Sequence, residues 1–512
     1  MQPYSERPSQ IGLDRRQVLI GAAAAGLTSL CPALALPSAA RVAQPDLIRE
    51  ENARPGNTAW RLDKVQIDPA TRYRSSVIEG YCSRTSLRAG ETLQVMVSTN
   101  PASAFQIDVY RLGYYGGTGG RLMRSFGPLP GTTQPDPDVG EERLRECRWE
   151  PALEFVIPDE WPSGVYVGKL TAQRGGWQSY VIFIVRDDRA CDFLFQCADS
   201  TWLAYNRWPN QWALYDDGKK EWYIGPEVRV SWDRPYGKYC QVIDNPLFTG
   251  SGSFMLWEFP LAYWMEKEGY DVSYISTVDT HADGAGLLRA RGFLSVGHDE
   301  YWSQEMYDHV QKAIAQGVSV GFLSSDTCWG LIPFWPSTQG PPHRVIARLG
   351  QFGPLEPEAV KTYPELAKFR QFGPTEADLI GARNVYPYSG GADWICAAEK
   401  HWLFAGTGMK AGDGIPGLVG FEWMGAPADK RGLEVVARGP VGKGALEREY
   451  TATLYPGPRD NVVFNASTIW WADGLSAPPG YKTPSAHGAT PRGPDPRVQR
   501  ITANLLARMR QA

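Results

Sequence analysis

Apolar and polar residues alternate with a period of two through residues 58–187, between Gly, Pro and Asn residues that mark turns. The alternation is clearest at 75–100, 103–117, 161–173 and 178–188. No helical period interrupts it. The pattern therefore predicts a β-sandwich of the immunoglobulin type over residues 58–187.

From residue 188 to about residue 350 the hydrophobic pattern changes, and short apolar runs alternate with amphipathic stretches. Strands are predicted at 191–198, 270–277, 293–298 and 318–325, helices at 257–269 and 303–317, and a helical turn at 285–292. The last helix has Ser303 as its N-cap and ends at Gly317. Strands that alternate with helices predict βαβ units and a largely parallel sheet, of the glutamine-amidotransferase or flavodoxin-like kind.

The last part of the chain is again rich in strand patterns. They fall at 401–408, 433–440 and 460–474, ahead of a Pro-rich loop and a terminal helix at 498–511. Two similar octapeptides, 351–358 and 371–378, indicate a recurrent turn and not a solenoid. The expected fold class is therefore multidomain α/β plus β, in which residues 188–512 form an α/β domain with a β-rich C-terminal part.

The composition is that of a globular protein and gives no reason to expect nucleic-acid binding. A chain of 512 residues suggests two or three domains, and 43% hydrophobic with 21% charged residues is ordinary for a globular protein. A net charge of −4 gives no electrostatic reason to expect nucleic acid as a partner. The 19 Trp and 24 Tyr residues fit core packing and aromatic-lined grooves.

Residues 1–35 have the features of a twin-arginine signal peptide. Arg15 and Arg16 precede a moderately apolar stretch, which ends in a small-residue cleavage pattern at 33–35. Export by this route would leave the protein periplasmic or secreted. The rest of the sequence has no run of about 20 apolar residues that could span a bilayer, so no stable membrane insertion is expected.

The cysteines indicate neither a definite disulfide nor a zinc site. Seven of the eight lie beyond the predicted signal peptide, so at least one of them is unpaired. Cys82 and Cys147 fall in the same predicted sandwich, and a disulfide between them is left open. No CxxC spacing indicates a zinc site.

Polar and ionisable residues follow several of the predicted parallel strands. In open α/β sheets, ligands bind outside the carboxyl ends of such strands. The residues that this rule places at one edge are Tyr205, Asp279, His281, Asp283, His298, Glu300 and Asp326. The sequence therefore predicts a cleft at that edge.

A structural explanation stays open for some of these residues. Asp299 and Glu300 precede a helix, whose dipole favours acidic side chains near its start. A histidine at a strand end, such as His298, is often a satisfied structural residue. Tyr205 and Tyr215 lie in what reads as a Trp-rich loop, where aromatic packing is the simpler explanation.

Five stretches taken together resemble the catalytic part of the large subunit of N,N-dimethylformamidase and its relatives. They are residues 198–218, 234–241, 274–283, 292–303 and 461–474. The resemblance covers roughly residues 190–475, and residues 107–121 are common in the same relatives. It implies hydrolysis of an amide C–N bond and one non-haem Fe³⁺ ion per chain, held by two tyrosinates and one glutamate.

The resemblance also implies which residues hold the iron. Glu300 matches the carboxylate ligand and Tyr205 matches one tyrosine. Tyr215 is chosen as the second tyrosine, with Tyr236 as its rival, because loop length leaves that assignment open. Phenolate and carboxylate oxygens are hard, anionic ligands that suit a trivalent iron. Such an ion would polarise the carbonyl and activate a water.

Three further residues would take part in catalysis. By the same resemblance, His298 lies beside the metal as a proton donor or orienter, and Glu422 passes a proton to the leaving amine. Asp326 departs from the relatives, because the chain reads SSDTC where they commonly read SGNTC. A carboxylate in place of this amide donor would repel a developing oxyanion.

Two other interpretations compete with this one. His281, Asp283 and His298 could form a facial triad of the iron-oxygenase kind. Alternatively, the protein binds glycan or cell wall outside the cell and retains the fold without catalysis. A serine hydrolase is disfavoured because the sequence has no GxSxG elbow. Under the leading hypothesis the partner is a small amide-like substrate, and a homo-oligomer is left open.

Overall fold

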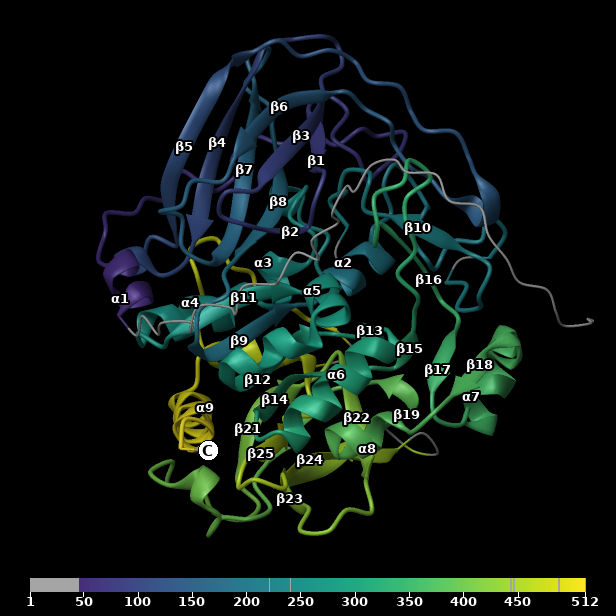
Figure 1. The fold of residues 1–512 in the computed structure, drawn as a ribbon. Helices are drawn as coiled ribbons and strands as arrows, with labels where there is room; N and C mark the ends of the chain where they lie inside the picture. The colour runs from purple at the N-terminus through teal and green to yellow at the C-terminus, as the bar shows by residue number, and fades with distance from the viewer. Residues whose placement is uncertain are drawn as a thin grey trace, which may run out of the picture. The chain divides into compact units, whose positions relative to one another are not determined.

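Figure 1 shows the fold of the protein as a computed structural model. The structure describes residues 46–220, 222–239, 241–442, 444, 447–486 and 489–511. All of them belong to one structural unit, Val42–Ala512. The predicted signal peptide, residues 1–35, lies outside the described residues. None of the described helices is long and apolar enough to cross a membrane.

The N-terminal region consists of two β-sheets, which follow the short helix α1 (Leu47–Asn52). One sheet has the order β1-β3-β6, formed by Glu79–Cys82, Thr92–Ser98 and Pro151–Val156. The other has the order β2-β8-β7-β4-β5, formed by Ser86–Arg88, Gln178–Arg186, Gly164–Ala172, Phe105–Leu112 and Gly120–Leu129. Alternating apolar residues of both sheets, such as Leu93 and Val95 of β3 and Ile107 and Val109 of β4, share one core. The immunoglobulin type predicted for residues 58–187 stays a prediction.

A seven-stranded sheet forms the centre of the second region. Its order is β11-β9-β12-β14-β25-β24-β23, from Val272–Ser276, Cys191–Cys197, Ala290–His298, Ser319–Ser325, Val462–Asn465, Arg448–Pro456 and Glu434–Val441. Neighbouring strands are parallel from β11 to β25, and the last two strands are antiparallel. The protein is thus mixed α/β with many sheets, and the predicted parallel core is present. Its assignment to a flavodoxin-like class stays a prediction.

The two faces of this sheet are covered by different helices, because successive side chains of a strand point to opposite faces. On one face, Leu294 and Val296 of β12 share a core with residues of α4 (Phe259–Lys267) and α9 (Pro496–Met509). On the other face, Phe293 shares a core with residues of α6 (Gln304–Ala315). With apolar residues on both faces, these strands read as continuous apolar runs in the sequence.

Short helices and small sheets connect these elements. The helices are α2 (Asp199–Tyr205), α3 (Phe254–Trp257), α5 (Thr277–Ala282), α7 (Pro357–Thr362) and α8 (Glu376–Ile380). The strand pairs are β10 (Arg229–Ser231) with β16 (Val345–Ala347), β19 (Ala382–Ser389) with β22 (Glu422–Pro427), and β20 (Ala392–Ile395) with β21 (Gly414–Val419). A four-stranded sheet has the order β13-β15-β17-β18, from Tyr301–Trp302, Gly330–Leu331, Gly350–Phe352 and Arg370–Phe372. In it, the two similar octapeptides contribute β17 and β18, which pair in parallel.

Local signals located several elements correctly. Helix α6 begins after Ser303, whose hydroxyl accepts a hydrogen bond from the Met306 amide, and the chain turns at Gly317 with φ of 102°. Three predictions were wrong. The predicted strand at 401–408 contains the 3-10 turn Trp402–Phe404, and the predicted strand at 460–474 ends at Asn465 before a second such turn, Ile469–Gly474. The Trp-rich loop begins as helix α2.

The cysteines form no disulfide among the described residues. Cys82 and Cys147 are both buried and free, so the pairing left open by the sequence is absent. Cys191, Cys197, Cys328 and Cys396 are likewise buried and free.

Candidate functional site

The carboxyl ends of β12 and β14 lie side by side, since His298 is in register with Ser325. The residues that follow these ends, Glu300 and Asp326, line a pocket of about 300 Å³. Helix α2 and the segment after it bring Tyr205 and Tyr215 to the same pocket. The predicted cleft at this edge of the sheet is therefore present.

Two backbone features orient the side chains at this edge. Gly297 has φ of 66°, and a Cβ there would lie 2.8 Å from the Trp257 carbonyl oxygen, so the strand passes close to α3 immediately before His298. Asp326 adopts a left-handed backbone with φ of 50°, which is uncommon for a residue other than Gly. Such conformations cluster at functional sites.

Two phenols and one carboxylate form the first cluster in the pocket. The Tyr205 hydroxyl donates to Glu300 Oε2 at 2.7 Å, and the Tyr215 hydroxyl donates to Glu300 Oε1 at 2.9 Å. The two hydroxyl oxygens lie 2.6 Å apart. The two phenol oxygens and Glu300 Oε2, which are anionic when deprotonated, thus lie 2.6, 2.7 and 3.3 Å from one another.

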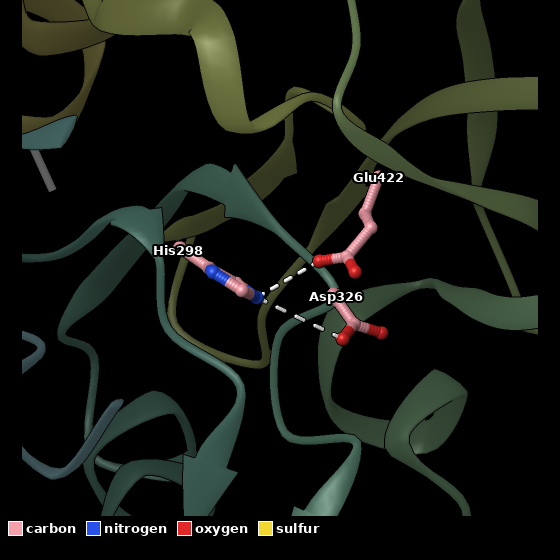
Figure 2. Close-up of side chains that lie close together, drawn as sticks. All are labelled: His298, Asp326 and Glu422. Carbon is pink, nitrogen blue, oxygen red and sulfur yellow. Dashed lines mark ion pairs between the residues drawn. The ribbon is translucent and has the colours of Figure 1, made fainter. Parts of the chain in front are cut away.

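The second cluster surrounds the imidazole of His298, as Figure 2 shows. Its Nε2 atom lies 2.8 Å from Glu422 Oε2, 3.3 Å from Glu300 Oε2 and 3.9 Å from Asp326 Oδ2. Glu422 comes from β22 and lines the same pocket as Glu300 and Asp326. The ligand atoms of His298, Asp326 and Glu422 all lie within 4.8 Å of one another, so this group can bind a metal.

The pKa values of the site follow from burial and charge. Burial by itself would lower the pKa of His298, but the carboxylates of Glu422, Asp326 and Glu300 together raise it well above its usual value. Burial, reinforced by the Glu422 carboxylate, raises the pKa of Asp326 well above its usual range. We therefore expect His298 to carry a positive charge when no metal is bound.

The phenols are protonated by the same reasoning. Burial and the Glu300 carboxylate raise the pKa of both Tyr205 and Tyr215 well above the usual value. The guanidinium of Arg348 lies 4.4 Å from the centre of the Tyr215 ring and acts in the opposite direction. Additional positive charge at the cluster would be needed to ionise the phenols.

Three residues of the site have no counterpart among the sequence predictions. Tyr301 places its hydroxyl oxygen 2.6 Å from that of Tyr215. Arg348 donates from Nη2 to the carbonyls of Leu214 and Tyr223 and so holds the segment that carries Tyr215. Gln241 contacts His298 Nδ1 at 3.0 Å. Tyr301 follows Glu300 directly, and Gln241 ends the stretch 234–241 that carries the family resemblance, so both could have been suspected. Arg348 comes from a distant segment without a local signal.

Asp299 has a structural role. Its Oδ2 atom accepts hydrogen bonds from Gln196 Nε2 at 2.7 Å and from Ser295 Oγ at 2.8 Å, both within the central sheet. It is not among the residues that line the pocket. Asp299 therefore stabilises the central sheet, a structural role other than the helix-dipole one expected, whereas His298 and Glu300 lie at the site.

The structure does not bring the rival facial triad together. His281 Nδ1 lies 2.8 Å from Ser303 Oγ, and Asp283 accepts from the Gly286 amide as an N-cap. Asp279 caps α5 and forms an ion pair with Arg186 at 3.0 Å. These residues were expected at the cleft, and that expectation was wrong, because the segment after β11 turns immediately into a capped helix.

Tyr236 also lies apart from the phenol cluster. It lines a different pocket, together with Asp199 and Arg344. Of the two candidates for the second tyrosine, Tyr215 is the one that contacts Glu300.

Fold and site together define an α/β protein with a pocket of oxygen donors and one histidine that can bind a metal. The chain belongs to the family described as N,N-dimethylformamidase beta subunit-like, C-terminal, whose model matches residues 106–485. The match begins in the N-terminal sheets, at the stretch 107–121 that is common in the relatives, and so includes more than residues 190–475. No curated protein matches the chain. Membership in this family suggests a hydrolase of the amide type.

Proposed function

We propose that this protein is an exported, iron-dependent hydrolase that breaks the amide C–N bond of a small molecule. Tyr205, Tyr215 and Glu300 would hold one Fe³⁺ ion, while His298 and Glu422 would move protons. The observation that carries the proposal is the convergence of two phenols and one carboxylate at the end of β12.

The spacing of these oxygen atoms fits a metal centre. Oxygen ligands that bind one ion at about 2.0–2.2 Å and at right angles lie roughly 2.8–3.1 Å apart. The hydroxyl oxygens of Tyr205 and Tyr215 and the Oε2 atom of Glu300 are separated from one another by 2.6, 2.7 and 3.3 Å, values that lie around that range. The donors are hard oxygens, which favours a trivalent ion over copper or zinc.

The charges of the cluster support the same conclusion. Burial leaves the phenols of Tyr205 and Tyr215 protonated, and a trivalent ion would supply the positive charge that ionises them. Arg348, behind the Tyr215 ring, favours the same ionised form. A bound Fe³⁺ ion would provide the Lewis acid that polarises a carbonyl.

The remaining steps belong to the protein's own side chains. Hydrolysis breaks the C–N bond, adds a hydroxyl group to the carbonyl carbon and delivers a proton to the nitrogen. Glu422 Oε2 and His298 Nε2 lie 2.8 Å apart beside the pocket, so the pair can take a proton from water and return it to the leaving nitrogen. Gln241 at Nδ1 holds the imidazole in position.

The proposal is tested by metal analysis and a visible spectrum of the full-length protein and two variants. The native protein is expected to hold about one iron per chain with a tyrosinate-to-iron charge-transfer band. Tyr205→Phe should lose or shift the band. Tyr307→Phe is the matched control, because its buried hydroxyl donates to the Thr375 carbonyl away from the pocket.

A second pair of variants separates the two ligand sets. Glu300→Gln should release the metal, whereas Glu422→Gln should retain it and lose amide hydrolysis. The opposite pattern would place the metal at His298, Asp326 and Glu422 and contradict the ligand assignment. A protein that stays metal-free after reconstitution with iron would instead favour the binding-protein interpretation.

We also propose export through the twin-arginine signal of residues 1–35. The supporting observation is the order of paired arginines, apolar stretch and cleavage pattern. Replacing Arg15 and Arg16 with Lys should keep the protein in the cytoplasm of an expressing bacterium, as fractionation would reveal. Unchanged export would contradict the proposal.

A further inference from the structure

Carboxyl groups outnumber basic side chains around the pocket. Its three carboxylates, from Glu300, Asp326 and Glu422, share the single imidazolium of His298. No Lys or Arg is among the described residues that line it. An iron ion bound by Tyr205, Tyr215 and Glu300 would neutralise that cluster, which leaves one imidazolium for two carboxylates.

Of the three carboxyl groups, Asp326 lies farthest from the His298 imidazole. Asp326 is 5% exposed, and the nearest cationic atom to its carboxyl group is His298 Nε2 at 3.9 Å, which is too far for a hydrogen bond. The closer carboxylate, Glu422, takes the short 2.8 Å contact with that nitrogen. A buried carboxylate that lacks a close partner is costly, unless a donor or a cation occupies the space it faces. Asp326 faces the pocket.

The walls of the pocket suit an organic cation. The lining includes the aromatic side chains of Trp222, Trp329, Tyr363, Tyr388 and Phe421. Aromatic faces attract cations through their quadrupole, and several of them together recognise ammonium groups that carry methyl substituents. A metal ion would gain nothing from these walls, whereas an alkylammonium group would contact both them and the carboxylate.

From this combination we propose that the substrate carries an ammonium group, held by Asp326 between the aromatic walls, with its amide directed toward Glu300 and His298. This position also accounts for a carboxylate beside an amide-hydrolysing centre, because the substrate's own cation offsets the negative charge that would otherwise repel a developing oxyanion. The part of the proposal that concerns hydrolysis rests on the proposed function. Recognition of the ammonium group does not.

Calorimetric titration of the full-length protein tests the recognition directly. The probes are choline and 3,3-dimethylbutan-1-ol, its neutral isostere, which has carbon in place of nitrogen. Choline should bind about tenfold more tightly or better, in line with a desolvated cation–π contact plus a charge-assisted interaction. Equal affinity of the native protein for both probes would overturn the proposal, whatever the behaviour of any variant.

Two variants assign the preference to Asp326. Asp326→Asn retains the shape and removes the charge, so the preference for choline should fall to parity. Asp308→Asn is the control, since Asp308 belongs to α6 on the protein surface, where it accepts from Gln304. If Asp326→Asn keeps the full preference, the assignment of the ammonium site is wrong.

Kinetics then separates this proposal from the proposed function. With matched amides, one bearing a trimethylammonium group and one a tert-butyl group, Asp326→Asn should lower kcat/KM for the first and raise it for the second. General damage would lower both. Choline preference without any amide hydrolysis would refute the proposed function and leave the ammonium site intact. A second metal ion per chain that depends on Asp326, with no choline binding, would overturn the ammonium site alone.

Discussion

Two buried groups of charged side chains in this protein differ in how their charges are matched. Arg111 and Glu266 form a two-pronged ion pair, at 2.9 and 2.8 Å, with both side chains fully buried. Asn52 and Tyr274 donate further hydrogen bonds to Glu266 at 2.8 Å. In the pocket, by contrast, three carboxyl groups lie 2.8, 3.3 and 3.9 Å from the single imidazole of His298.

The difference separates a structural role from a functional one. Buried charge is tolerated when every charge has a partner of good geometry, and it is costly otherwise. Arg111 lies on β4 and Glu266 on α4, so their pair joins the N-terminal sheets to the helical layer of the central sheet. The carboxyl groups without a close cationic partner face an open pocket, where a bound metal ion or substrate can supply the positive charge that they lack. The predictions below test this contrast, beginning with the largest effect.

Glu300→Gln should lower amide hydrolysis by about 10³-fold or more, because it removes a ligand of the proposed Lewis acid, which supplies several kcal/mol. The free energy of unfolding of the metal-free protein should stay the same or rise, since one of three crowded carboxylates is gone. Steady-state kinetics and urea unfolding measure the two quantities. A large loss of stability with activity retained would mean that Glu300 has a structural role and not a catalytic one.

Arg111→Met should destabilise the fold by about 3–5 kcal/mol, the usual cost of leaving one member of a buried ion pair alone. Urea unfolding measures this, and the metal content of the folded fraction should not change. Arg88→Met is the matched control: the Arg88 and Asp188 side chains are 34% and 38% exposed, so losing that ion pair should cost no more than about 1 kcal/mol. Similar effects from both substitutions would remove the distinction between matched and exposed pairs.

Asp473 is another buried carboxylate, with the Tyr481 hydroxyl as a hydrogen-bond donor. Burial raises its pKa to about 8, above the value of about 3.9 in an unfolded chain. The folded protein therefore holds this proton more tightly, and the contribution of Asp473 to stability is full below about pH 3.9 and is lost as the pH rises toward 8.

Asp473→Asn should consequently raise the free energy of unfolding at pH 8 by about 1–3 kcal/mol and have little effect near pH 5. The amide stays neutral and still accepts from Tyr481. Unfolding curves for the native protein and the variant at both pH values measure the effect. An equal change at pH 5 and pH 8 would show that the charge of Asp473 is not responsible.

Tyr307→Phe should give the smallest change. It removes a single hydrogen bond to the Thr375 carbonyl and should cost about 0.5–1.5 kcal/mol, without an effect on metal content or on the visible spectrum. Thermal unfolding measures the difference. A change in metal content would mean that tyrosines outside the pocket also affect the site.

Much of the central sheet was predictable from contiguous residues. Strands β9, β11, β12 and β14 fall where short apolar runs predict them, and α6 begins and ends at its capping signals. The predicted strand at 401–408 failed because its aromatic residues pack as a 3-10 turn, in which the His401 side chain accepts from the Leu403 amide. Periodicity alone cannot distinguish such a short apolar turn from a strand.

The sequence by itself determined the parallel strands, the edge at which they end, and the presence of His298, Glu300 and Asp326 at that edge, because these depend on local periodicity and on a general rule of open sheets. Only the tertiary structure decided which polar residues face the pocket. It made Asp279 and Asp283 helix-capping residues and placed His281 against Ser303, and it brought in Gln241 and Arg348 from distant segments. The physical reason is that a site is completed by long-range packing, which fixes where side chains meet and leaves no periodic mark on the chain.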